Sequence, residues 1–327
     1  MRLAFVALAL GTTLTSCASP PSVTPPLSVR LGSAAARFGF AEVGHVDRAA
    51  SWMAPLAESK KLLYVSDIGA EDVYVFSYPD GVLMGTLTGF IEPNGLCVDK
   101  KGDVYVSDTY AGELLEYAHG RSKPIRKIKD PGNPLGCSVD PLTGNLATSH
   151  ANGTFAIFTE AKGKPQVIVG GRVLHEGMFC GYDDKGNLFA DGQNSYGLIQ
   201  LGEIPKGGNG PSAISVNLKM GWPGGVQWVG HDVAVGDQFA DKFNPSQDVN
   251  AIYRFKVSGT TGTLLSTAEL NGGGDVVQFW IEGANAIGPD AQNEDVAFWK
   301  FPGGGNALKM VNYNFYEPVG ATVSNPK

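Results

Sequence analysis

The chain has 327 residues, of which 43% are hydrophobic and 17% are charged. That length and apolar content are ample for a large core, and all-β domains of this size commonly form one unit. The 44 glycines and 20 prolines favour many turns and short strands over long helices. The net charge of −7 argues against nucleic-acid binding, which needs clustered Lys and Arg.

Residues 1–16 have the pattern of an export signal. Arg2 is followed by an apolar run over residues 3–10, which is too short to span a bilayer permanently. The segment ends in Leu-Thr-Ser before Cys17 and resembles the bacterial lipobox. The resemblance implies cleavage before Cys17, acylation of that cysteine and anchoring to a membrane of the cell envelope. An ordinary secretory peptide with an incidental cysteine is the alternative. Ala18 stands where an inner-membrane retention signal would have aspartate, which favours the outer membrane.

Residues 17–45 are predicted to be a flexible tether. Their composition, rich in Pro, Ala and Ser, cannot bury enough apolar surface to order the chain. A folded domain is expected over residues 46–327, and none of its segments is apolar enough to cross a bilayer.

One pattern recurs along this domain. It reads Pro-Asn-Gly-Leu-Cys-Val-Asp-Lys-Lys-Gly-Asp-Val-Tyr-Val-Ser-Asp over residues 93–108, with copies over 134–150 and 176–191. Weaker copies cover residues 223–237 and 275–290. Each copy predicts an inner strand, a tight turn and a second strand, and two outer strands complete a blade. A repeat of roughly 40–50 residues is typical of β-propellers, whose blades must stack to bury both apolar faces.

The repeats predict an all-β fold, a six-bladed β-propeller of four-stranded antiparallel blades. The predicted second strands begin near Leu62, Asp103, Asn145, Asn187, Asp232 and Asn285. Residues 317–324 copy the opening of a blade but have no second strand after them. We therefore expect them to close the ring as the inner strand of the first blade. Residues 51–55 could supply that strand instead, which leaves seven blades as an alternative.

The repeat over residues 95–108 resembles an NHL repeat, and also the blades of the regucalcin/gluconolactonase group. The likeness extends over most of residues 60–324. It implies a propeller fold. It says little about function, because such propellers host binding modules, scaffolds, lactonases and lyases.

Six positions at the starts of the inner strands should ring the mouth of the central channel: Asn94, Leu135, Glu176, Gly224, Asp275 and Val319. In the gluconolactonase group a comparable set of carboxylate and amide oxygens holds a divalent metal that polarises the substrate. The resemblance thus implies Asn94, Glu176 and Asp275 as ligands of one calcium or zinc ion. Leu135 departs from that pattern, since it cannot bind metal. Polar residues that only solvate the mouth are the alternative.

Two histidines add to the candidate ligand site. His150 stands where other copies have aspartate, and His175 precedes Glu176. Both could face the mouth, where they could bind metal or carry protons. Two unrelated loop histidines are the other interpretation.

Five of the second strands end in a carboxylate: Asp67, Asp108, Asp191, Asp237 and Asp290. Repetition of one residue type at one structural position favours a structural role over a catalytic one. We expect these carboxylates to accept backbone N–H bonds of the following loop.

Three cysteines fall in consecutive inner strands: Cys97, Cys137 and Cys180. Export permits disulfides, but strands of neighbouring blades are expected to lie too far apart for one. Buried free thiols are therefore predicted. Most of the larger aromatic residues fall inside predicted strands, so blade packing is favoured over a sugar or peptide site: Trp222, Trp228, Phe279, Trp280 and Trp299.

The favoured function is a monomeric binding or scaffold module of the cell envelope, holding a protein, a glycan or a small ligand. The sequence contains no complete catalytic arrangement. A metal-dependent hydrolase of lactones or esters, with its site at the channel mouth, is the alternative.

Overall fold

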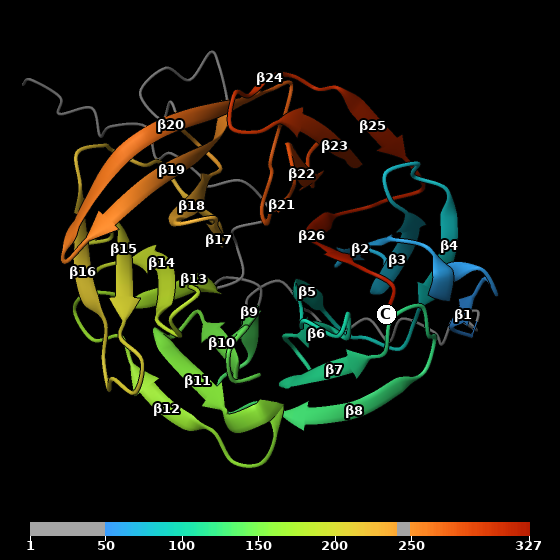
Figure 1. Ribbon diagram of the computed structural model, residues 1–327, viewed down its shortest axis with the longest axis horizontal. Coiled ribbons are helices and arrows are strands. Elements are labelled where there is room, and N and C mark those ends of the chain that lie inside the picture. Colours follow the sequence, from blue (N-terminus) through green and yellow to red (C-terminus); the bar gives the residue numbers. More distant parts are fainter. Residues whose placement is uncertain (1–49, 241–248) are drawn as a thin grey trace, which may run out of the picture.

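The computed structural model describes residues 50–240 and 249–327. The signal peptide 1–16, Cys17 and the tether 17–45 lie outside the described residues. Within the described part, six antiparallel blades surround a central axis (Figure 1). The fold is the six-bladed β-propeller that the repeats predict. None of the described residues forms a helix long and apolar enough to span a bilayer.

Blades A to C take up the first half of the domain. The strands of each blade, from the axis outward, are as follows. Blade A has β26 (Pro318–Ser324), β2 (Leu62–Asp67), β3 (Asp72–Ser77) and β4 (Leu83–Leu87); blade B has β5 (Pro93–Val98), β6 (Val104–Asp108), β7 (Glu113–Tyr117) and β8 (Pro124–Lys129); blade C has β9 (Pro134–Val139), β10 (Leu146–His150), β11 (Thr154–Phe158) and β12 (Gln166–Val169).

Blades D to F complete the ring. Blade D has β13 (Glu176–Tyr182), β14 (Leu188–Gln193), β15 (Ile199–Ile204) and β16 (Ser212–Val216); blade E has β17 (Pro223–Val229), β18 (Asp232–Asp237), β19 (Asn250–Ser258) and β20 (Thr261–Asn271); blade F has β21 (Trp280–Glu282), β22 (Asn285–Asp290), β23 (Asp295–Lys300) and β25 (Lys309–Asn312). The outer strand β20 also pairs in parallel with β16 and with the short β24 (Gly305–Asn306), which covers edges that would otherwise be free.

The two ends of the domain meet in blade A. Strand β26 pairs with β2 in antiparallel register, Leu62 opposite Ser324, so the last strand of the chain is the innermost strand of the first blade. Figure 1 shows β26 beside β2. The alternative with seven blades is wrong, because β1 (Trp52–Met53) pairs with the outer edge of β4 and lies far from the axis.

The core consists of six apolar layers, one between each pair of neighbouring blades. Strand β2 shows how its sequence makes this possible. Leu62 and Tyr64 pack against blade B, whereas Leu63 and Val65, on the other side of the strand, pack against blade F. A strand that is buried on both faces reads as a continuous apolar run, which explains why the second strand is the clearest part of each repeat.

The inner strands approach one another closely around the axis. A Cβ atom placed on Gly95 of β5 would lie 2.5 Å from the carbonyl oxygen of Leu135 on β9, a distance that real Cβ atoms essentially never show. Glycine at the opening of an inner strand therefore lets the neighbouring backbone come close.

Candidate functional site

The propeller has two faces, one at each end of its central axis, and they differ chemically. All inner strands begin on one face, called here the entry face, where the second strands end and where the chain passes from blade to blade. All inner strands end on the other, the exit face, which carries turns within the blades together with the segment 54–61 that leads into β2 and residues 325–327.

On the entry face, strand-end aspartates are buried and accept backbone hydrogen bonds. Asp290 is 1% exposed and accepts N–H bonds from Gly274, Asp275, Gln292 and Asn293. The donors thus include the loop before the inner strand as well as the loop after the second strand. The other blades show corresponding bonds: Asp67 with the amides of Ala70, Tyr316 and Glu317; Asp108 with Ile91 and Glu92; Asp191 with Phe179; Asp237 with Gly221, Trp222 and Phe239.

Burial governs the ionisation of these carboxyl groups. It raises the pKa of Asp108 and of Asp237 and raises that of Asp191 well above its usual range, where the nearby charge of Asp237 adds to the effect. The backbone N–H bonds act in the opposite direction, because they stabilise the charged form.

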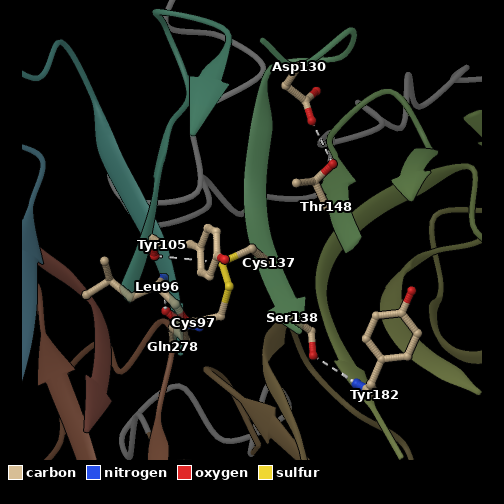
Figure 2. The surroundings of a disulfide bond; sticks show 9 residues. All are labelled: Leu96, Cys97, Tyr105, Asp130, Cys137, Ser138, Thr148, Tyr182 and Gln278. Atoms are coloured by element: carbon tan, nitrogen blue, oxygen red, sulfur yellow. Dashed lines mark hydrogen bonds between the residues drawn. A yellow bond between two sulfur atoms is a disulfide. The ribbon is translucent and has the colours of Figure 1, made fainter. Parts of the chain in front are cut away.

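In blade C, different residues make the link between the end of the second strand and the loop that enters the inner strand. His150 ends β10 fully buried, and its Nε2 lies 2.8 Å from Oδ1 of Asp130, a residue of the loop that enters β9. Asp130 also accepts bonds from the amide of Gly132 and from Thr148 Oγ1 (Figure 2). Here the loop supplies the carboxylate and the strand supplies its partner. A Cβ on Gly132 would lie 2.3 Å from His150 Nδ1, so the imidazole requires glycine at that position.

The ring of candidate ligands has mixed accessibility. Asn94 and Asp275 are each 3% exposed, whereas His175, just before β13, and Glu176, its first residue, are exposed. Leu135 and Val319, which share the ring, are buried and apolar. Within the described residues, no group of three or more His, Cys, Asp and Glu side chains could hold a metal ion. The residues present therefore fit a divalent-metal centre poorly, and we derive no catalytic step through one.

A glutamine spans the middle of the channel. Gln278, in the segment entering β21, accepts a hydrogen bond from the amide of Leu96 on β5 and donates one to its carbonyl, both at 2.9 Å. Its own backbone N–H bonds to Val319 at 3.0 Å. A side-chain amide thus imitates a strand pair between blades F and B. Gln227 does the same toward Ile281, joining blades E and F.

A disulfide joins blades B and C, so the prediction of free thiols at Cys97 and Cys137 is wrong. Their Cα atoms are 5.6 Å apart, within the ordinary range for a disulfide (Figure 2). The close approach at Gly95 brings β5 and β9 within that range, whereas inner strands without such contact would not reach it. Cys180 is free and buried, and burial raises the pKa of its thiol to about 12.

The disulfide lines a cavity of about 220 Å³ at the exit end of the channel. Its walls combine the aromatic side chains of Trp228, Trp280, Tyr182 and Phe279 with polar groups, among them Gln227, Gln278 and Asp184. The ring of Trp228 stacks on Phe189, with centroids 5.5 Å apart. The Nε1 atom of Trp228 is buried and has no hydrogen-bond partner among the described residues. Trp280 instead donates to Glu282 at 3.1 Å.

Two further cavities open on the exit face. One, of about 460 Å³, shares Val98 and Trp280 with the channel cavity and is lined by the turn after β5 and by residues 325–327. The other, of about 200 Å³, lies between blades B and C and contains the buried Glu116, paired with Arg126 at 2.5 Å. None of the five candidate ligands of the sequence lines any of these three cavities.

Sequence reasoning did not identify the residues of the exit face. Asp99, Asp140 and Asp183 each follow an inner strand and accept the amide of the residue two positions on, which forms an Asx turn. Their signal was present, since an aspartate follows the inner strand in each of the three strong copies. Gln278 carried no such signal, because its partner is 182 residues away. Of the aromatic residues predicted to pack between blades, Phe279 and Trp299 are buried there, and Trp228 and Trp280 pack against the layers while partly buried. Phe279, Trp228 and Trp280 also line the channel cavity.

Fold and comparisons together define the protein as a six-bladed β-propeller. Residues 90–117, which span most of blade B, match the family described as the NHL repeat. No curated protein matches the sequence significantly. The narrower resemblance to the gluconolactonase group stays a prediction.

Solved structures agree with this fold. A chain of a nidogen/laminin complex superimposes with a TM-score of 0.63 at 12% identity, over 82% of this chain and 99% of that one. A protein of unknown function from Bacteroides caccae gives 0.61 at 12% identity, over 81% and 99% of the two chains. Hydrazine synthase of Kuenenia stuttgartiensis gives 0.57 at 13% identity, over 80% of each. At these identities the likeness establishes the fold alone.

Proposed function

We propose that this protein is a ligand-binding propeller of the cell envelope, tethered to a membrane through acylated Cys17. Its ligand is a small, mostly apolar molecule that occupies the exit-face channel cavity. One observation carries the ligand class: a cavity of about 220 Å³ with several aromatic side chains in its walls and Gln278 in its lining. Aromatic and apolar walls with few polar groups are typical of small-molecule sites.

The cavity chemistry limits the ligand further. The Gln278 and Gln227 amides each use one N–H and one oxygen lone pair for backbone hydrogen bonds, which leaves one further donor and one further acceptor on each. A ring-shaped ligand with one polar group, such as a phenol or a small lactone, would suit the aromatic walls that Trp228 and Trp280 provide.

Thermal shift with phenol and indole as probes tests this assignment. Binding to the native state alone raises the melting temperature in proportion to the logarithm of ligand concentration. We expect both probes to stabilise the wild type and Trp52→Ala, a control whose indole is 44% exposed at the outer edge of blade A. Trp228→Leu should lose most of the shift. Equal shifts in Trp228→Leu and the wild type would refute the assignment.

The membrane anchor is tested separately. Wild-type protein expressed with its own amino terminus should partition into the detergent phase of Triton X-114, whereas Cys17→Ser should remain in the aqueous phase. Mass spectrometry of the amino-terminal peptide should show acyl chains on Cys17. An aqueous wild type, cleaved elsewhere and without acyl chains, would contradict the lipoprotein proposal.

The hydrolase alternative stays a prediction that rests on the resemblance, and metal content decides it. The purified protein would be equilibrated with calcium and zinc, desalted and analysed by mass spectrometry. The alternative requires about one ion per chain, lost in the variant Asn94→Ala/Glu176→Ala/Asp275→Ala, followed by activity on a lactone panel. If neither the wild type nor the triple variant retained a metal ion, the hydrolase alternative would be refuted.

A further inference from the structure

The entry face carries an exposed apolar patch on blades A and B. Tyr316, Ile91 and Tyr110 are 67%, 55% and 54% exposed, and we call these three residues the A–B entry patch. Tyr316 and Ile91 occupy corresponding positions, each followed by a Glu-Pro pair that opens an inner strand. Single exposed apolar residues are ordinary on protein surfaces, but a group of them at adjacent loops marks an interaction site.

Buried carboxylates hold these loops in place. Asp67 accepts the amides of Tyr316 and Glu317 at 2.8 and 2.9 Å, and Asp108 accepts those of Ile91 and Glu92. The loops after the second strands are tied to the same segments, since Thr109 donates its amide to the carbonyl of Glu92 at 2.9 Å. Loops that are already ordered lose little entropy when a partner binds, which favours affinity.

Two glutamates lie directly beside the patch. Burial, with added repulsion from the charges of Asp108 and Glu317, raises the pKa of Glu92 to about 7. Burial also raises the pKa of Glu317, with added contributions from Asp67 and Asp275. Within the described residues, neither glutamate forms an ion pair, and Glu92 Oε1 is buried without a hydrogen-bond donor. An added cation at this place would offset the mutual repulsion and favour the charged form of both glutamates.

We infer that the A–B entry patch docks a segment of a partner protein in which a Lys or Arg lies beside an apolar side chain. The cationic group pairs with Glu92 and Glu317, and the apolar side chain packs against Tyr316, Ile91 and Tyr110. Charge complementarity selects this occupant over nucleic acid or an anionic membrane, which the two glutamates repel. The surface lies on the face opposite the channel cavity, so one propeller could hold its small ligand and its partner together.

Fluorescence anisotropy with labelled twelve-residue peptides tests the inference. One peptide alternates Leu and Lys, and the matched peptide has Glu in place of every Lys. We expect the Lys peptide to bind the wild type and the Glu peptide not to bind. Tyr316→Ala and Glu92→Gln should each weaken binding about tenfold, the loss typical of a central interface residue. Both residues are at least partly exposed, so circular dichroism should show an unchanged fold.

Tyr196→Ala is the matched control. Tyr196 is 83% exposed in the entry-face loop between β14 and β15 of blade D, away from the patch. Its replacement should change affinity less than twofold. An equal loss in Tyr196→Ala, equal binding of the Glu peptide, or unchanged binding in Tyr316→Ala would overturn the inference. Concentration-dependent self-association that Tyr316→Ala abolishes, measured by sedimentation, would also overturn it by assigning the patch to a second copy of the chain.

Discussion

The two faces of the propeller use aspartate in different ways. On the entry face, Asp290 is buried and binds amides from two separate loops, one of them before the inner strand and one after the second strand. On the exit face, Asp99 is half-buried and binds amides only within its own turn, at Lys101 and Asp103. The difference follows from connectivity. The entry face carries both the loops that join blades and the turns between second and third strands, and Asp290 ties one of each together, whereas the exit-face turn at Asp99 joins two strands of one hairpin and is held locally.

Covalent and side-chain links reinforce the exit half of the inner ring. The Cys97–Cys137 disulfide joins blades B and C, and Gln278 joins blade F to blade B. The opposite end of the ring has the close packing of glycine against backbone, as at Gly95.

Removing the disulfide should have the largest effect. Cys97→Ala/Cys137→Ala removes a cross-link between residues separated by 40 positions in sequence, so the unfolded chain gains conformational entropy. The free energy of unfolding should fall by about 2–4 kcal/mol. Chemical denaturation of variant and wild type measures the difference. Dithiothreitol should lower the stability of the wild type and leave that of the double variant unchanged. A response to the reductant in both proteins would contradict the role of this bond.

Removing an entry-face carboxylate should come next. Asp290→Ala leaves four backbone N–H groups without their acceptor, and loss of a buried hydrogen-bonding partner costs about 1–3 kcal/mol. The variant would be compared by urea denaturation. Proteolysis should also become faster in the loops 272–275 and 291–294. A variant as stable as the wild type would mean that these loops are held by packing alone.

Removing an exit-face turn aspartate should cost less. Asp99→Ala loses two local hydrogen bonds at a half-exposed site, where solvent replaces them, so about 0.5–1 kcal/mol is expected. The same urea experiment serves as readout. If Asp99→Ala lowered the free energy of unfolding as much as Asp290→Ala, the aspartates of the two faces would contribute equally to stability, and the proposed contrast would be wrong.

The smallest effect concerns pH. Because burial raises the pKa of Glu92 to about 7, the folded protein retains a proton there that the unfolded chain releases at lower pH. This contribution is complete below the unfolded pKa of 4.5 and is lost progressively as the pH rises from there through about 7. Glu92→Gln does not titrate, so it should melt about 1–2 °C above the wild type at pH 8, relative to their difference at pH 5. A constant difference across that range would show that Glu92 titrates in its ordinary range.

Much of the architecture could be predicted from sequence. The predicted second strand near Leu62 begins at Leu62, and that near Asp103 begins at Val104. These strands were found because a doubly buried strand is apolar throughout. The disulfide could not be predicted, since it depends on how closely β5 and β9 pack around the axis. The cavity could not be predicted either. In the sequence, Trp228 and Trp280 have the pattern of ordinary strand residues, and only the closed ring brings them together at one end of the channel.

The repeat, the number of blades and the position of the buried strands could be predicted from local hydrophobic patterns. Which residues meet across the axis depends on how the blades close into a ring. Gln278 bonds to Leu96, and Cys97 to Cys137, because the ring closes through β26 and brings blades F, A, B and C together. Contacts between residues distant in sequence leave no periodic signal, since each occurs once and follows from the geometry of the closed ring.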